Sequence, residues 1–237
     1  MLVINLIIAR TGNFEESLMK QWRRYMNKNP NIKSFFIMLD NKISEEYIVT
    51  DDTIIMKGTE SNVPGIYQKT LRAMKICLEK KEYNDVKYFI RTNISSFWIW
   101  DRLLKFLQDV PTNNYAGTGN ILIKKDRDWD SPTGSNMILS RDIVKLLINH
   151  YNDADAKKEA DDIAIGGVLN KCSVPLKKYP WFLCINTLDS NNVRNTIMQV
   201  INTIPEDVFT IRNNLISSKL RNTHEEYTYS KLVDTFY

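Results

Sequence analysis

The stretch KYFIRTNISSFWIW, residues 87–100, decides the fold. Its apolar first half predicts a buried strand, which ends in a polar segment, Arg91–Ser96. An aromatic segment follows directly, and we predict a helix over residues 97–110, stopped by Pro111. Proteins with open α/β sheets bind their ligands at the carboxyl ends of the strands. The polar segment is therefore where we expect a functional site.

Strands and helices alternate along the rest of the chain, which predicts parallel strands joined by helical crossovers. We expect strands at residues 3–9, 34–39, 53–58 and 115–124, and helices at 11–27, 63–83, 141–151 and 161–169. The fold class that follows is α/β: one open, mostly parallel, Rossmann-like sheet with helices on both faces, in a single domain.

Composition narrows the class of partner. The chain has 237 residues, of which 43% are hydrophobic and 25% charged, as expected for one globular domain. Its net charge is +4 and its basic residues are dispersed, which favours a small anionic ligand over nucleic acid. The three cysteines lack metal-ligand spacing. The apolar opening, residues 1–10, is too short to span a membrane and is predicted to be the first strand.

Two further segments fall where such a sheet places its site. The first is DSPTGSNMILSRD, residues 130–142, a tight loop followed by a strand and the start of a helix. The second is KEADDIAIGGVL, residues 158–169, in which Asp161 and Asp162 occupy the first turn of a helix. Carboxylates are stabilised there by the helix dipole, so this pair has two open interpretations: structural capping or catalysis.

In this order, the segments resemble the glycosyltransferases of the GT-A fold, above all the β-1,3-galactosyltransferase and Fringe group with its viral and bacterial relatives. The resemblance covers roughly residues 60 to 180. The matching residues of the three motifs are Arg91, Thr92 and Phe97; Thr133, Gly134, Leu139, Ser140, Arg141 and Asp142; and Asp161, Asp162, Ile163 and Gly166.

The metal motif departs from the family. Asn93, Ile94 and Ser95 stand where the family has an acidic triplet that holds Mn²⁺ against the donor diphosphate. Neutral oxygens are weak ligands for such an ion, so the sequence does not establish a metal cofactor. One alternative is Mn²⁺ or Mg²⁺ held by displaced ligands, for which the candidates are Asp126, Asp128, Asp130 and His224. The alternative that we favour is direct neutralisation by cations, for which the candidates are Arg91, Lys124, Lys125, Arg212, Lys219 and Arg221.

The resemblance also implies roles for individual residues. Asp162 corresponds to the general base of an inverting transfer and Asp161 to a neighbouring acid that orients the acceptor. The donor-binding candidates are Ala9, Arg10, Thr11, Asp52, Lys69, Arg91, Thr92, Asn93 and Ser95. The acceptor-binding candidates are Thr133, Gly134, Ser135 and Trp129. Trp98, Trp100 and Trp181 are further candidates for stacking on a sugar.

The function that these features predict is transfer of a hexose from a nucleotide-sugar, with UDP as the expected nucleotide, to a glycan or glycoconjugate hydroxyl. The alternative is a module of the same fold that binds nucleotide-sugar or glycan without catalysis. We expect a nucleotide-binding part at about residues 1–100, an acceptor and catalytic part at about 101–190, and a C-terminal extension at about 191–237. Either a cytoplasmic protein or one domain of a larger protein fits the sequence.

Overall fold

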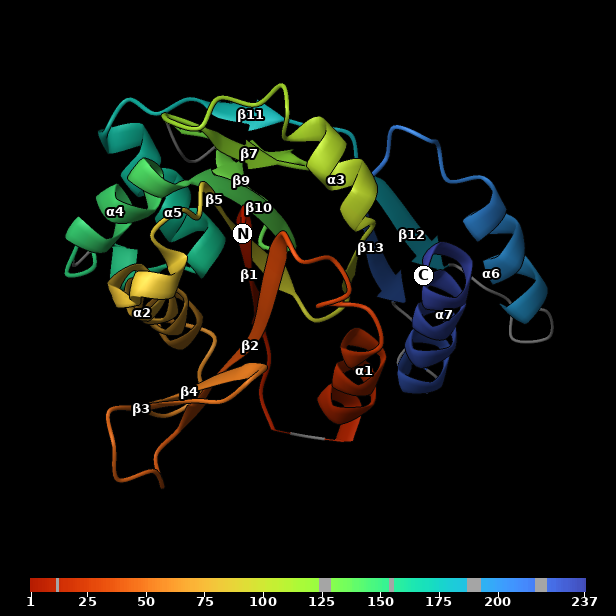
Figure 1. The fold of residues 1–237 in the computed structure, drawn as a ribbon, viewed down its shortest axis with the longest axis horizontal. Coiled ribbons are helices and arrows are strands. Elements are labelled where there is room, and N and C mark those ends of the chain that lie inside the picture. Colours follow the sequence, from red (N-terminus) through yellow and green to blue (C-terminus); the bar gives the residue numbers. More distant parts are fainter. Residues whose placement is uncertain (12, 124–128, 154–155, 187–192, 216–220) are drawn as a thin grey trace.

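The computed structural model describes residues 1–11, 13–123, 129–153, 156–186, 193–215 and 221–237 (Figure 1). Within these residues the central sheet has eight strands. In spatial order they are β11 (Leu176–Lys178), β7 (Ala116–Thr118), β10 (Asn136–Ser140), β5 (Tyr88–Asn93), β1 (Val3–Ile8), β2 (Ile32–Asp40), β4 (Thr53–Lys57) and β3 (Tyr47–Val49). Parallel pairing joins β5 to β1, β1 to β2, β2 to β4 and β11 to β7, whereas β10 and β3 run antiparallel to their neighbours. The open, mostly parallel sheet predicted from the sequence is confirmed.

Both faces of this sheet are buried, which is why its inner strands are continuously apolar. Successive side chains of a strand point to opposite faces. In β1, Val3 and Ile7 enter one hydrophobic core, and Ile4 and Leu6 enter the other.

Helices cover each face of the sheet. One core is completed by α2 (Gly65–Glu79), α4 (Arg141–Asn149) and α5 (Asp161–Lys171). The opposite core is completed by α1 (Asn13–Arg23), α3 (Trp100–Phe106), α6 (Val193–Asn202) and α7 (Arg221–Phe236). In Figure 1 the two groups of helices lie on opposite sides of the central strands. The remaining short elements are β8 (Ile121–Leu122), β9 (Ser131–Pro132) and the 3₁₀ turns η1 (Lys81–Tyr83) and η2 (Ala156–Lys158).

The start of the predicted helix over residues 97–110 is wrong. Residues 96–98 form a strand, β6 (Ser96–Trp98), and the helix α3 begins only at Trp100. β6 pairs with β13 (Thr210–Leu215), which pairs with β12 (Phe182–Asn186) in a second sheet. Aromatic residues suit strands as well as helices, and the partner that decides between them lies more than a hundred residues downstream.

Burial excludes Trp98 and Trp100 as residues that stack on a sugar. Trp98 and Trp100 are fully buried, with their rings stacked at a centroid distance of 6.1 Å. Both belong to the aromatic core on the side of α1 and α7. They stabilise the fold by burial, which contributes about 1.5–3 kcal/mol for a large apolar side chain.

Candidate active site

A cleft of about 630 Å³ opens at the carboxyl ends of β1 and β5. The position follows from the sheet register, which pairs the last residue of β1, Ile8, with the last residue of β5, Asn93. The chain after each strand therefore emerges at the same edge. The residues that line the cleft are Ile8, Ala9, Arg10, Glu15, Glu60, Ser61, Asn62, Ile66, Lys69, Asn93, Ile94, Ser95 and Arg212.

The turn at the end of β5, residues 93–95, lines the cleft. The indole nitrogen of Trp22, on α1, donates a 2.8 Å hydrogen bond to the carbonyl of Ile94. The amide of Asn93 donates to the carbonyl of Ser135 at 3.1 Å, and the amide of Asn213 donates to the carbonyl of Ser95 at 3.0 Å. Three separate elements thus fix the backbone of this turn, although none of these bonds uses its side chains.

Two arginines contact the side chains of the turn. The Nη1 of Arg91 donates to the Oδ1 of Asn93 at 2.7 Å, and the Nη1 of Arg212 donates to the Oγ of Ser95. These are the oxygens that a metal ion would have to use at this position. A divalent ion does not fit a site whose neutral oxygens already face guanidinium groups. Moreover, the described residues contain no group of three His, Cys, Asp or Glu side chains placed to hold a metal.

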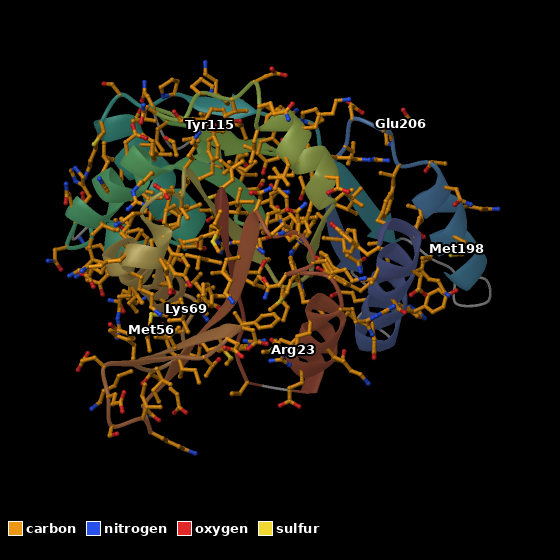
Figure 2. All side chains as sticks on the ribbon, in the orientation of Figure 1. Arg23, Met56, Lys69, Tyr115, Met198 and Glu206 are labelled. Atoms are coloured by element: carbon orange, nitrogen blue, oxygen red, sulfur yellow. The ribbon has the colours of Figure 1, made fainter. Side chains whose placement is uncertain are left out.

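Two further basic residues that line the cleft, Lys69 and Arg10, each pair with a carboxylate. Lys69, on α2, is 1% exposed, and its Nζ donates to both oxygens of Glu60 at 2.8 Å and to the carbonyl of Ala9 at 2.7 Å (Figure 2). Burial lowers the pKa of Lys69, and hydrogen bonding to Glu60 opposes that shift. Arg10 contacts Glu15 at 2.6 Å and keeps 65% of its side chain exposed. The positive charges of Lys69 and Arg10 are therefore each matched by a neighbouring carboxylate.

Arg91 connects the cleft to the acidic pair at the start of α5. Its Nη2 lies 2.5 Å from the Oδ2 of Asp161, and both side chains are nearly inaccessible to solvent. Burial raises the pKa of Asp161, the Arg91 charge opposes that shift, and the neighbouring Asp162 charge adds to it. Asp161 is therefore the counter-ion of a buried arginine. The helix N-cap is Ala160, so neither aspartate is the capping residue.

Asp162 is held in a fixed orientation beside Gly134. Its Oδ1 accepts from the amide of Ile163 at 2.9 Å, and its Oδ2 accepts from the amide of Gly134 at 3.2 Å. A Cβ at position 134 would lie 3.1 Å from Oδ2, so only a glycine brings the loop this close without displacement. Asp162 is half-buried and does not line the cleft itself.

The loop of Thr133, Gly134 and Ser135 is fastened to the end of β5. The carbonyl of Ser135 accepts bonds from the hydroxyls of Thr92 and Ser96 as well as from the amide of Asn93. The hydroxyl of Thr133 bonds those of Thr118 and Ser135. Thr92 is buried and also accepts from the Trp98 indole at 2.8 Å, so it positions the loop without lining the cleft.

The structure separates several predicted residues from the cleft. Asp52 precedes β4, at the amino end of that parallel strand, where Arg23 of α1 holds it at 2.6 Å (Figure 2). Burial alone would raise the pKa of Asp52, yet hydrogen bonds from Arg23 and Thr53 hold it below its ordinary value. Trp129 lies against Gly167 on α5, and His224 belongs to α7.

The remaining predicted residues do not line the cleft or lie outside the described residues. Thr11 is exposed next to Arg10 and is not among the residues that line the cleft. Trp181 packs partly buried against the aromatic core. Of the metal candidates, Asp130 is an exposed residue near Trp129. The other acidic metal candidates, Asp126 and Asp128, lie outside the described residues, and so do the candidate cations Lys124, Lys125 and Lys219. The side chain of Arg221 is likewise not described.

The sequence reasoning missed two charged residues that line the cleft, Glu60 and Glu15, and also Trp22, which bonds to the turn of residues 93–95. Glu60 follows the carboxyl end of β4 just as Asn93 ends β5, and that position is a signal that could have identified it. Glu15 lies near the start of α1 and Trp22 in its last turn, and no local pattern distinguishes them from ordinary helix residues.

No family model and no curated protein matches the sequence. One solved structure, described as a glycosyltransferase involved in the glycosylation of the major capsid of PBCV-1, is similar over 96% of this chain and 99% of its own, with a TM-score of 0.51 and 8% identity. The chain has a GT-A-like glycosyltransferase fold. At this identity the likeness concerns the fold alone. No helix among the described residues has the length and apolar character needed to cross a membrane.

Proposed function

We propose that this chain is a glycosyltransferase that binds a nucleotide-sugar, with UDP as the expected nucleotide, in the cleft at the ends of β1 and β5. The observation that supports this most is the position of a basic cleft next to an acidic helix start. Arg91 contacts Asn93 on the cleft side and Asp161 on the helix side, so the two parts form one connected site. A donor diphosphate and a general base need this kind of proximity.

Asp162 is the residue that we assign as general base. In the proposed step an acceptor hydroxyl attacks the anomeric carbon, the bond from that carbon to the diphosphate oxygen breaks, and the hydroxyl proton passes to Asp162. The nucleoside diphosphate leaves on the face opposite the attack, so the configuration inverts. The two amide donors on Asp162 support this role, since they fix the carboxylate in one orientation.

Asp161 is better suited to positioning than to contact with an acceptor. Its carboxylate is buried and paired with Arg91, which leaves no exposed oxygen for a substrate. The acceptor is proposed to approach over Gly134, which touches Asp162. Trp129, which packs against Gly167 of α5, stays a predicted acceptor contact.

A second candidate function is binding of a nucleotide-sugar or glycan without turnover. One observation favours it: Asp162, the residue assigned as the base, does not line the cleft. Incubation with a panel of nucleotide-sugars and acceptor glycans separates the two functions, because only an enzyme releases free nucleoside diphosphate in an acceptor-dependent way.

Asp162→Asn tests the base directly. Removal of a general base is expected to lower kcat by about 10²–10⁴-fold, while donor binding measured by calorimetry stays within about twofold. Asp142→Asn is a matched control, because Asp142 is likewise the second residue of its helix, α4, and lies away from the cleft. It should retain turnover. Full activity in Asp162→Asn would refute the assignment of the base.

A further inference from the structure

We infer that the turn of residues 93–95 binds a diphosphate directly, because the two arginines behind it make its side chains hydrogen-bond donors instead of metal ligands. The inference rests on the proposed function, since the diphosphate is that of the donor. A metal-binding motif offers oxygen acceptors to a cation. This turn has the opposite polarity, and a site lined by donors takes an anion.

The orientation of the Asn93 amide follows from its neighbour. A guanidinium group carries donors and no acceptor, so the atom of Asn93 that faces Arg91 at 2.7 Å must be the carbonyl oxygen. The amide nitrogen, with two hydrogens, is then the group that Asn93 has left for the cleft that it lines. Arg91 thus holds Asn93 in the orientation that suits an anion.

The same argument applies to Ser95. Its hydroxyl accepts a hydrogen bond from Arg212, so its own hydrogen remains to be donated. Arg212 also lines the cleft, and places a planar, permanently charged group beside that hydroxyl. Arginine is the side chain best matched to phosphate oxygens, because it can offer two parallel N–H donors.

The charges around the cleft agree with an anionic ligand. Among its described lining residues are three cations, Arg10, Lys69 and Arg212, and two carboxylates, Glu15 and Glu60. The cations thus outnumber the carboxylates in the lining, and a diphosphate can gain further attraction as it competes with Glu15 for the exposed Arg10. A metal ion brought to the same turn would instead meet both guanidinium groups, an arrangement that Coulomb repulsion disfavours.

Calorimetric titration with UDP, GDP and dTDP tests the inference, in EDTA and separately with MnCl₂. At least one of these nucleotides is expected to bind the wild-type protein in EDTA, with a Kd that MnCl₂ changes by no more than about twofold. Asn93→Asp replaces the amide donors by a carboxylate next to Arg91, and should weaken that binding by about tenfold or more. Arg212→Gln should weaken it by a similar factor.

The matched control is Asn84→Asp, which makes the same chemical change four residues before the other end of β5, a strand roughly 17 Å long. It should bind like the wild type, and thermal melts would verify that all variants fold. Binding that requires MnCl₂, or equal binding by the wild type and Asn93→Asp, would overturn the inference. So would failure of all three nucleotides to bind. Because binding is measured without turnover, metal-free binding without transfer would refute the proposed function alone, whereas transfer together with nucleotide binding that requires MnCl₂ would refute only this inference.

Discussion

Replacing Asp161 by asparagine should destabilise the protein strongly, because it removes the counter-charge of a buried arginine. Arg91 is 1% exposed, and its partners among the described residues are Asp161 and Asn93. Its Nε has no hydrogen-bond partner among them. In Asp161→Asn the guanidinium would keep two neutral amide neighbours and lose the one ion pair that it forms with the described residues, so its burial would no longer be compensated.

The magnitude follows from the burial of both partners. Removing one member of a buried ion pair costs about 3–5 kcal/mol. Asparagine has nearly the same volume as aspartate and still offers an oxygen to Arg91, so we expect the lower end, about 3 kcal/mol. For a protein of this size each kcal/mol lowers Tm by about 2–4 °C, which gives a decrease of about 6–12 °C.

Thermal and urea unfolding, followed by circular dichroism at pH 7, measure this loss. Glu79→Gln is the control, because the Lys75–Glu79 pair on α2 is well exposed and should contribute less than about 0.5 kcal/mol. Replacing both charges, as in Arg91→Met with Asp161→Leu, should recover part of the loss. A decrease in Tm below about 2 °C for Asp161→Asn would refute the view that this pair holds the site together.

Two further perturbations each test one hydrogen-bonded side chain, the first beside the cleft and the second away from it. Trp22→Phe removes the 2.8 Å bond to the carbonyl of Ile94, and should cost about 1–3 kcal/mol in urea unfolding and weaken nucleotide binding, since the turn loses one of its three anchors. Unchanged binding would show that the anchor is dispensable. Burial raises the pKa of Asp142, but hydrogen bonds from Ser140 and from the Asn114 amide outweigh it and hold the pKa below its ordinary value. Because its folded pKa is depressed, this carboxylate adds stability above the unfolded pKa and loses it as the pH falls through the folded pKa. Asp142→Asn should therefore be about 1 kcal/mol less stable than the wild type at pH 7, and the difference should disappear as the pH falls through the folded pKa of Asp142, as judged by urea unfolding across pH. A difference that persists at low pH would contradict the sign.

The sheet and its edge were predictable because local patterns carry them. The apolar run of β5 and its polar end predict a buried strand with polar residues at its carboxyl end, and in the structure Asn93 and Ser95 line the cleft there. Ala9 and Arg10 follow the same logic at the end of β1. Asp52 did not, because the sequence shows a strand and its polar neighbours without showing which end of the strand meets the cleft.

Long-range pairing was not predictable from the sequence. Arg212 reaches the cleft because β13 pairs with β6, two strands more than a hundred residues apart. The sequence offered Arg212 as one of six dispersed cations, without a reason to prefer it. Similarly, Phe97 and Trp98 read as the start of a helix until a distant partner strand is known. Local periodicity has no access to either contact.

The burial of Arg91 decides which positive charge is available to a diphosphate. Sequence resemblance put Arg91 among the donor-binding residues, but its charge is already matched by Asp161 inside the protein, where the attraction between them is strongest. Arg91 therefore acts on the cleft through Asn93, whose orientation it sets, and not through its own charge. The attraction for a diphosphate has to come from cations on the cleft surface, and Arg212 is the one whose hydrogen bond already reaches the turn at the end of β5. It follows that neutralising Arg212 should reduce affinity for the nucleotide, whereas neutralising Arg91 should reduce stability first.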